Sequence, residues 1–497
     1  MTTTRLAMTE LIGASSAYAN WDAIPWKSIS KHVQRLQMRI AKAVREQRWG
    51  KVKALQWLFT HAYSAKCLAV RRVVQNAGKK TAGVDGVLWK TAAQKLAGVQ
   101  SLQRRGYHPQ PLRRIYIPKK NGKLRPLGIP TFADRAMQAL HLFALEPVAE
   151  TQADPNAYGF RPKRSAADAI QQCFNALATR QCARWIFEGD IKACFDQISH
   201  PWLVEHIPMD TPILEKWLAA GFMDNGVLYP TMAGTPQGGI ASPVLANMAL
   251  DGLEAVAIAA APRRHKINVV KYADDFIITG ATKELLEMKV KPAVIAFLKE
   301  RGLELSEEKT HITHIDDGFD FLGFNVRKYN GKLLIKPAKN AVKRFLDNIR
   351  EFIKTNVAIK TADLIRQLNL KIRGWANYYR HQVSKRTFGY VDHQIYLALA
   401  TWIERRHPLK TASWKHQHYF RSVGQRNWVF FAIDRDGEGR KIVRELFLAS
   451  SLPIIRHIKI KAKATPYDPA YFDYFKRRAE TRRVSSLIWR GGVSWPR

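Results

Sequence analysis

The stretch from Val269 to Gly280, VVKYADDFIITG, constrains this chain more than any other. Apolar, β-favouring residues stand on both sides of Asp274 and Asp275, which predicts two short buried strands joined by a tight turn. Two adjacent carboxylates at the tip of an apolar hairpin repel each other and bring no evident benefit to folding. They make chemical sense if divalent cations neutralise them, since Mg²⁺ takes oxygen ligands and paired ions serve phosphoryl transfer. A bare Asp-Asp pair is more often a solvated turn, so the other motifs must decide.

A third carboxylate follows an earlier apolar run. The segment Trp185–Asp190, WIFEGD, predicts a buried strand that ends on an acid, and a helix is expected near Ser199 with Pro201 in its first turn. An isolated Asp at a strand end is usually a turn or cap residue. Here Asp190 is also a candidate metal ligand, because it and the hairpin carboxylates would converge on one face of a sheet.

The charge of the chain indicates its partner. Lys and Arg number 80 against 41 Asp and Glu, a formal net charge of +39 over 497 residues. Such an excess favours a polyanion, bound in a salt-dependent manner. A membrane surface is the rival, but no apolar run approaches the length of a spanning helix, the longest being about Leu253 to Ala261. Residues 336–497 carry a net charge of +22, so the last third is the most basic region. Nucleic acid is the expected partner.

The cysteines exclude two common frameworks. None of the four forms a C-x-x-C pair, so neither a disulfide scaffold nor a zinc finger is expected, and a reducing interior is indicated: Cys67, Cys173, Cys182 and Cys194. His416 and His418 lack Cys or Asp neighbours and are not expected to bind metal. The N-terminus does not read as a secretory signal.

Helical spacing of apolar residues runs from Ser28 to Asn76 after a polar lead-in: Val33, Leu36, Ile40, Val44, Val52, Leu55, Leu58 and Phe59. Basic residues fill the remaining surface, as either a solvated face or an RNA contact. The segment Ser165–Asp168 is a plausible capping box for a helix. Residues 340–356 repeat apolar residues at helical spacing again.

A basic hairpin is expected over Pro111 to Pro130, with Asn121-Gly122 as a two-residue turn. It is either a phosphate clamp or an edge strand kept soluble by its charges. The glycine-punctuated loop Gly234–Pro243 precedes a helix, and its small residues would let the backbone approach a base pair closely.

Eight motifs follow one another between Thr81 and Phe324: T-x-G-V-D-G, L-R-P-L-G-I-P, Y-G-F-R-P, D-I-K-x-x-F-D, T-P-Q-G-G-x-x-S-P, Y-A-D-D, L-S-E-E-K-T and F-L-G-F. In order and spacing the series resembles the reverse transcriptases of group II introns, the bacterial intron-encoded maturases. Residues 372–379, IRGWANYY, resemble the maturase (thumb) region of that family, and residues 405–463 resemble the region after it.

The resemblance implies roles for particular residues. Asp190, Asp274 and Asp275 match the carboxylates that hold two Mg²⁺ ions. Phe195 matches the aromatic under the incoming sugar, where a 2′-hydroxyl would clash. Four further residues match or neighbour positions that contact the nucleotide: Gln237, Lys119, Arg125 and its neighbour Lys123. Lys309 matches a lysine that protonates the leaving pyrophosphate. Lys309 follows two Glu and is alternatively paired with them.

The fold class implied is α+β, a right-hand polymerase. The expected regions are a basic helical N-terminal extension (1–78), fingers and palm with an antiparallel sheet (79–335), a helical thumb or maturase domain (336–400) and a small basic DNA-binding region (401–497). Many relatives end in an H-N-H endonuclease with paired cysteines. None are present here, so that activity is not expected.

The implied function is RNA-directed DNA synthesis coupled to splicing and mobility of the encoding intron. Expected partners are the intron RNA, target DNA with its primer and deoxynucleotides, with no membrane and a homodimer left open, in a bacterial cytoplasmic ribonucleoprotein. Two alternatives remain: a splicing-only maturase, which would be expected to lose the carboxylates or Gln237, and a reverse transcriptase domesticated for defence or diversification.

Overall fold

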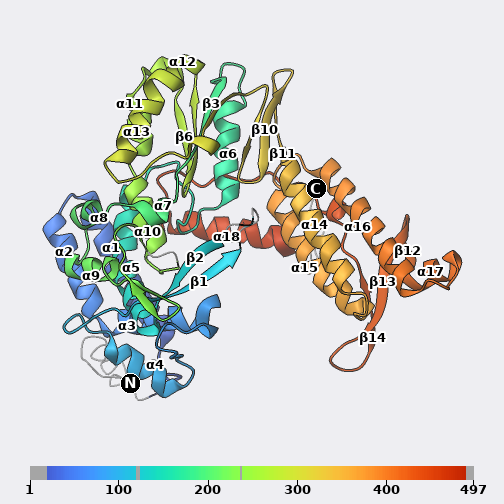
Figure 1. The fold of residues 1–497 in the computed structure, drawn as a ribbon, viewed down its shortest axis with the longest axis horizontal. Coiled ribbons are helices and arrows are strands. Elements are labelled where there is room, and N and C mark those ends of the chain that lie inside the picture. Colours follow the sequence, from blue (N-terminus) through green and yellow to red (C-terminus); the bar gives the residue numbers. More distant parts are fainter. Residues whose placement is uncertain (1–19, 119–121, 123, 236–237, 488–497) are drawn as a thin grey trace, which may run out of the picture.

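The computed structural model describes residues 20–118, 122, 124–235 and 238–487, with side chains up to Thr481. Lys119, Lys123 and Gln237 therefore lie outside the described residues. The N-terminal helices gather at the lower left of Figure 1, and a bundle of three long helices lies on the right. Between and above them stands the sheet that carries the Asp-Asp hairpin.

The expected N-terminal helices are present as α1 (Trp26–Arg45), α2 (Trp49–His61) and α3 (Tyr63–Gln75), followed by α4 (Ala92–Ser101). Their apolar residues are buried together against α5 (Phe132–Gln152), as predicted from the spacing. Leu58 is the exception: it is 42% exposed, so its assignment to the apolar face was wrong. Of the polar lead-in, Trp21 belongs to the core and meets the Trp26 ring edge-on at 4.9 Å.

The basic hairpin is present as β1 (Leu112–Pro118) and β2 (Leu124–Ile129). Its register pairs Pro118 with Leu124. The expected Asn121-Gly122 turn includes Asn121, which lies outside the described residues, so the turn stays a prediction. The hairpin is also not an isolated pair, since β1 runs parallel to β4 (Phe222–Asp224), which pairs with β5 (Val227–Tyr229). The sheet order is β2-β1-β4-β5.

The sheet of the Asp-Asp hairpin has the order β6-β7-β3-β8 and is antiparallel throughout. Its strands are β3 (Trp185–Asp190), β6 (Asn268–Tyr272), β7 (Asp275–Gly280) and β8 (His311–His314). Side chains alternate between its two faces, and each face enters a different apolar core. Phe276 and Ile278 join the N-terminal core, whereas Ile277 joins the core shared with the right-hand helix bundle. Burial on both faces explains why these strands read as apolar runs rather than alternating ones.

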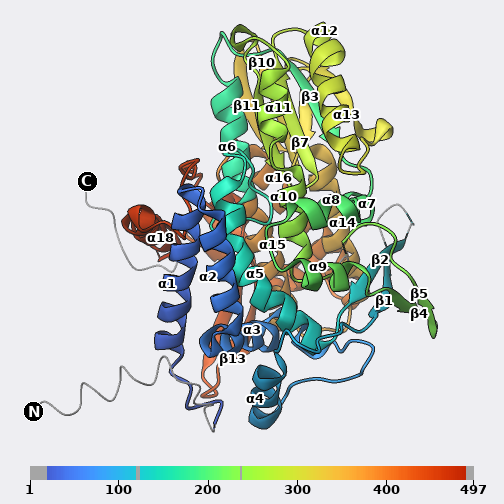
Figure 2. The same cartoon turned by 90° about the vertical axis from the view of Figure 1, so that its left-hand side faces the viewer.

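Short helices connect and cover these strands: α6 (Ala166–Leu177), α7 (Cys194–Gln197), α8 (His200–His206), α9 (Thr211–Leu218), α10 (Ser242–Leu250), α11 (Leu253–Ala259), α12 (Lys283–Leu285) and α13 (Lys291–Lys299). The expected helix after Ser199 is α8, and the Ser199 side chain caps it by accepting from the Trp202 amide. Figure 2 shows α11 and α13 beside the sheet.

One apolar stretch was misjudged. Ser242–Ala259 is long and apolar enough to cross a membrane by length and composition, so the expectation that no run approaches that length was wrong. In the structure the stretch is divided into α10 and α11 by Gly252 at φ 97°. Half of it is buried, and its two helices pack against α5, α13 and β6. These contacts are those of a helix pair in a protein core.

A second antiparallel sheet, β11-β10-β9, leads into the right-hand bundle. Its strands are β9 (Phe319–Phe321), β10 (Phe324–Tyr329) and β11 (Lys332–Pro337), and the bundle comprises α14 (Lys339–Thr355), α15 (Thr361–Tyr379) and α16 (Lys385–Arg406). The apolar residues predicted for the first of these helices are buried, from Val342 to Ile353. The Trp375 ring stacks on Phe345 at 4.7 Å and fixes α15 against α14.

The C-terminal part contains α17 (Ala412–Tyr419), the sheet β12 (Phe420–Val423), β13 (Arg426–Arg435) and β14 (Lys441–Glu445), and α18 (Phe472–Leu487). After β14 the chain turns back, and α18 crosses the middle of the molecule (Figure 1). Arg45 of α1 pairs with Asp468 at 2.6 Å, and the Tyr467 hydroxyl donates to Glu146 of α5 at 2.6 Å. The segment that leads into α18 thereby contacts α1 and α5.

The capping box predicted at Ser165–Asp168 was wrong. The Ser165 hydroxyl donates to the Asp168 carboxylate at 2.8 Å and accepts no hydrogen bond from a backbone amide in the first turn of α6. Asp168 is fully buried and accepts from His457, the Ile460 amide and Arg478, all in the returning C-terminal segment. Although burial raises the pKa of Asp168, the His457 hydrogen bond and the Arg478 charge together lower it well below its usual value. All four cysteines are free, as expected.

Candidate active site

The sheet brings the three predicted carboxylates together. Strand β7 begins at Asp275, which stands directly opposite Asp190, the last residue of β3. Asp274 occupies the two-residue turn between β6 and β7, after Ala273 at φ 58°. Directly opposed residues in antiparallel strands hold their Cβ atoms about 5 Å apart. Residues far apart in the sequence thus meet at one end of the sheet.

The charges of these carboxyl groups oppose one another. Burial, the charge of the neighbouring Asp274 and a hydrogen bond with Asp190 together raise the pKa of Asp275 to about 7. Asp275 nevertheless keeps an exposed surface, so the group is crowded by protein without being sealed from solvent. The pKa of Asp274 is also raised, first by burial and then by the Asp190 charge. The cluster carries more negative charge than its surroundings offset.

Lys309 is the cation nearest to these groups among the described contacts. Its Nζ donates to Asp190 Oδ2 at 2.8 Å, while most of its side chain stays exposed. It lies in a short turn, Glu307–Lys309, held by the Ser306 amide, which donates to the Asp190 carbonyl at 2.8 Å. Lys309 therefore forms its ion pair with Asp190 rather than with the two preceding Glu. The hydrogen bond from Lys309 to Asp190 raises the pKa of the lysine.

These donor types fit Mg²⁺, which prefers carboxylate oxygens, and the raised pKa of Asp275 marks negative charge that a cation would offset. Among the described residues, however, no three His, Cys, Asp or Glu side chains are grouped closely enough to hold a metal ion as they stand. One oxygen of Asp190 is already bonded to Lys309. We therefore treat the carboxylates as the residues that would hold the metal and derive no metal geometry from them.

The Asp-Asp hairpin is anchored by Lys271, a residue that the sequence analysis did not single out. Lys271 of β6 is 1% exposed, and its Nζ contacts Asp154 at 3.0 Å, Asp251 at 3.1 Å and the Leu250 carbonyl at 2.5 Å. Its backbone pairs with residues 156 and 158 on the other side. A lysine in an apolar strand is itself a signal, because a buried cation requires acidic partners.

Gly159 lies against the turn that carries Asp274. A Cβ at Gly159 would stand 2.3 Å from the Ala273 nitrogen, and the Gly159 carbonyl accepts from Asn247 of α10 at 2.9 Å. The Y-G-F-R-P motif therefore supports the Asp-Asp turn directly, a role that the sequence alone did not indicate. Gly189 has a similar role in β3, where a Cβ would stand 2.2 Å from the Phe276 ring.

We expect Gly159→Ala to lower the free energy of unfolding by roughly 1–3 kcal/mol, because the added methyl must displace backbone rather than a flexible side chain. Thermal and urea denaturation of the full chain measure the change. Gly389→Ala is the matched control, since Gly389 lies in α16 and an added methyl there would have no atom within 4 Å. That control should be neutral or stabilising. Equal destabilisation by both variants would contradict the close approach.

The predicted nucleotide-contacting residues are only partly described. Phe195 is half-buried in α7, with the exposed Phe160 ring edge-on at 6.1 Å. The Thr235 amide donates to the Phe195 carbonyl at 2.6 Å, which fixes the start of the glycine-punctuated loop beside α7. A Cβ at Gly238 would stand 2.5 Å from the Gly128 carbonyl of β2. The loop thus joins the element of Phe195 to the basic hairpin, where Arg125 is exposed.

Comparison with known proteins agrees with this arrangement. The family model "Reverse transcriptase (RNA-dependent DNA polymerase)" matches residues 117–326, "N-terminal domain of reverse transcriptase" matches 21–102, and "Group II intron, maturase-specific domain" matches 342–420. The group II intron-encoded protein LtrA of Lactococcus lactis subsp. cremoris is 31% identical over 410 residues, 63% of this chain and 68% of the relative. Protein YkfC of Escherichia coli K12 is 33% identical over 303 residues, 51% and 78% of the two chains.

These matches define the class of protein as a reverse transcriptase. More narrowly, the chain belongs to the group II intron-encoded reverse transcriptases and maturases. Among solved structures, a telomerase from Candida albicans in complex with a telomeric RNA fragment is similar in fold, and the match covers 62% of this chain and 64% of the telomerase chain. Its identity is 12% and its TM-score 0.37, a likeness too weak to bear on function.

Proposed function

We propose that the protein is an RNA-directed DNA polymerase that binds the RNA of its own group II intron, assists its splicing and copies the reverse-spliced intron into cDNA. The observation that supports this most is the meeting of Asp190, Asp274 and Asp275 at one end of the β3–β7 pair. A two-carboxylate turn without chemistry would have no reason to face a third acid across the sheet.

In this proposal the three carboxylates would hold two Mg²⁺ ions, whose positive charge would favour loss of the primer hydroxyl proton and offset charge on the triphosphate. The chain's own groups complete the site. Phe195 would lie under the incoming sugar and exclude a 2′-hydroxyl, and Arg125, with Lys119, Lys123 and Gln237, would contact the nucleotide. Lys309 holds Asp190 in place. Its donation of a proton to the leaving pyrophosphate stays a prediction.

The regions proposed are an N-terminal extension over 1–78, fingers and palm over 79–335, a thumb over 336–400 and a basic DNA-binding region over 401–497, and these bounds stay predictions. Proposed partners are the intron RNA, target DNA with its primer and deoxynucleotides, in a bacterial cytoplasmic ribonucleoprotein. The net charge of +39 supports binding to nucleic acid whose affinity falls steeply with salt.

Two assays on the purified full chain test this function. The first is extension of a DNA primer on an RNA template with Mg²⁺, and the second is splicing of the encoding intron RNA at low Mg²⁺. We expect both activities, with DNA synthesis abolished by chelation. Splicing without synthesis would identify a splicing-only maturase, and synthesis without splicing would favour a reverse transcriptase domesticated for another role. The absence of both activities would overturn the proposal.

A further inference from the structure

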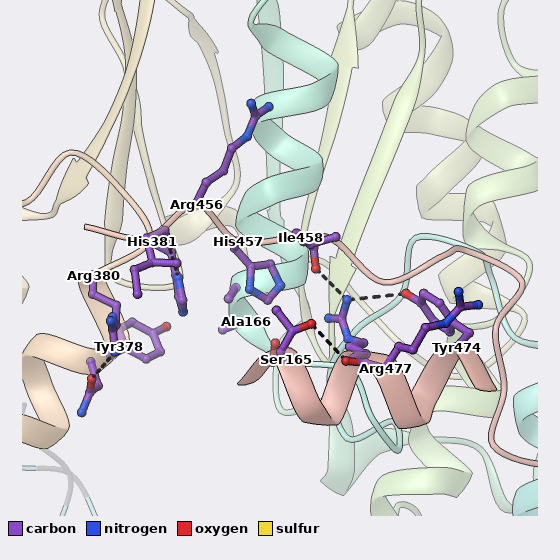
Figure 3. A pocket seen from close by; sticks show the side chains of 15 residues that line it. Ser165, Ala166, Tyr378, Arg380, His381, Arg456, His457, Ile458, Tyr474 and Arg477 are labelled. Carbon is purple, nitrogen blue, oxygen red and sulfur yellow. Dashed lines mark hydrogen bonds between the residues drawn. The ribbon is translucent and has the colours of Figure 1, made fainter. Parts of the chain in front are cut away.

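A pocket of about 570 Å³ lies where three distant segments meet: the start of α6, the end of α15 and the returning segment that leads into α18 (Figure 3). It is separate from the carboxylate site, whose residues do not line it. Its volume falls within the usual range of about 300–1,000 Å³ for ligand sites. Ser165, Tyr378, Arg380, Arg456 and Arg477 are among the residues that line it.

Arg380 is the residue that makes this pocket unusual. It is 8% exposed, and its Nε and Nη2 are buried without a hydrogen-bond partner among the described residues. Its Nη1 donates to Asn377 Oδ1 at 3.2 Å, which is a neutral acceptor. Burial lowers the pKa of Arg380, as expected for a desolvated cation. A buried guanidinium without an anion is costly, so the fold keeps a cation here that its own groups do not satisfy.

The surroundings of Arg380 add positive potential. Four arginines and two histidines line the pocket, and no Asp or Glu of the described chain does. The nearby Asp168 is already saturated by donors from Ser165, His457, Ile460 and Arg478, so it does not compensate Arg380. Ala166 and Ala167, in the first turn of α6, also line the pocket. Backbone N–H groups in a first turn lack intrahelical acceptors, which favours an anion at this end of the helix.

The lining also includes apolar and aromatic side chains, namely Ile455, Ile458, Tyr378 and Tyr474. Tyr378 is 41% exposed, and its hydroxyl donates to the Leu322 carbonyl at 2.8 Å, which holds the ring in a fixed orientation. A bare phosphate would fill only a small part of the volume. A nucleotide fits the combination better, because its phosphate would meet Arg380 while its base could stack on an aromatic ring.

We propose that this pocket takes one unpaired nucleotide of the intron RNA, with its backbone phosphate bound by Arg380 and the strand continuing past Arg477, which lies on the other side of His457 beside Tyr474 (Figure 3). The occupant is an unpaired nucleotide because a base within a duplex is stacked between neighbours and cannot enter a concave site. The inference rests on the proposed binding of intron RNA. The α15 side of the pocket lies within the match to the maturase-specific domain. The inference adds that this domain and the segment after residue 455 together bind one nucleotide of that RNA.

The first test needs neither polymerisation nor intron RNA, so its result is readable even if the proposed function fails. Thermal unfolding of the full chain is followed with increasing inorganic phosphate, in wild type and in Arg380→Gln, with chloride at equal ionic strength as the reference. We expect phosphate to raise the Tm of the wild type and not that of the variant. Without phosphate, the variant should be at least as stable as wild type, because an unpaired buried charge is removed. A less stable variant with an unchanged response to phosphate would show that Arg380 is structural and overturn the site.

The second test measures affinity for a short unpaired oligouridylate and for an RNA duplex by fluorescence anisotropy. Arg477→Gln, an exposed change on α18, should weaken oligouridylate binding several-fold and reduce the salt slope by about 1. Lys476→Gln is the matched control: it removes the same charge from the neighbouring position, which does not line the pocket. Equal losses in both variants would indicate general electrostatics and overturn the site. So would duplex RNA competing as well as the unpaired strand, or free uridine monophosphate binding more tightly than the oligomer.

Discussion

Asp275→Asn is expected to lower DNA synthesis by about 10³-fold or more, because a neutral amide cannot replace a metal-holding carboxylate. The variant keeps the side-chain volume, and it removes a charge that burial, Asp274 and Asp190 all disfavour. Its Tm in chelator should therefore be no lower than that of wild type. Primer extension under single-turnover conditions measures the loss, and thermal unfolding monitors the fold.

Asp317→Asn is the matched control for that variant, since Asp317 is exposed in the turn after β8 and outside the carboxylate cluster. It should retain full activity. Affinity for RNA should be the same in both variants, because the carboxylates are not proposed to contact it. If Asp275→Asn lost its fold or its RNA affinity along with its activity, the acidic cluster would be structural and the assignment of the catalytic site would fail.

Lys271→Met is expected to cost about 3–5 kcal/mol of stability, the largest single effect on folding that we predict. Methionine keeps an unbranched side chain, one heavy atom shorter, but leaves Asp154 and Asp251 buried without their cation. Because Lys271 sits next to Tyr272 and its backbone pairs with residues 156 and 158, loss of this anchor should also loosen the Asp-Asp turn. Urea denaturation gives the free energy.

Lys42→Met provides the contrast for that measurement. Lys42 pairs with Glu46 at 3.8 Å on the surface of α1, with both side chains exposed. Removing an exposed pair of this spacing should change stability by less than about 0.5 kcal/mol. Similar costs for the two lysines would show that the buried ion pairs of Lys271 do not anchor the hairpin.

Much of the fold could be predicted because local patterns agreed with it. The Asp-Asp hairpin, the strand that ends at Asp190, the helix after Ser199, the N-terminal helices and helix α14 follow from apolar spacing and turn residues. The convergence of three carboxylates was also predictable, because each stands at a strand end or turn and antiparallel pairing brings such ends together.

What could not be predicted depends on contacts between distant segments. Ser165 and Asp168 have the spacing of a capping box, but the carboxylate of Asp168 is bound by residues about 300 positions later. Lys271 reads as an interruption of a strand until Asp154 and Asp251 are placed beside it. Gly159 reads as loop flexibility until Ala273 is found against it. A linear pattern gives each residue's preference and not its partner.

The link between Asp168 and Arg478 has a consequence for synthesis on the ribosome. The two residues are 310 positions apart, and at about 5–20 residues per second roughly 15 to 60 seconds pass between their translation. During most of that interval the Asp168 carboxylate of α6 has neither His457 nor Arg478 as a partner, because those residues have not yet been translated. The part of the fold around α6 can therefore reach its final packing only after Arg478 has been translated.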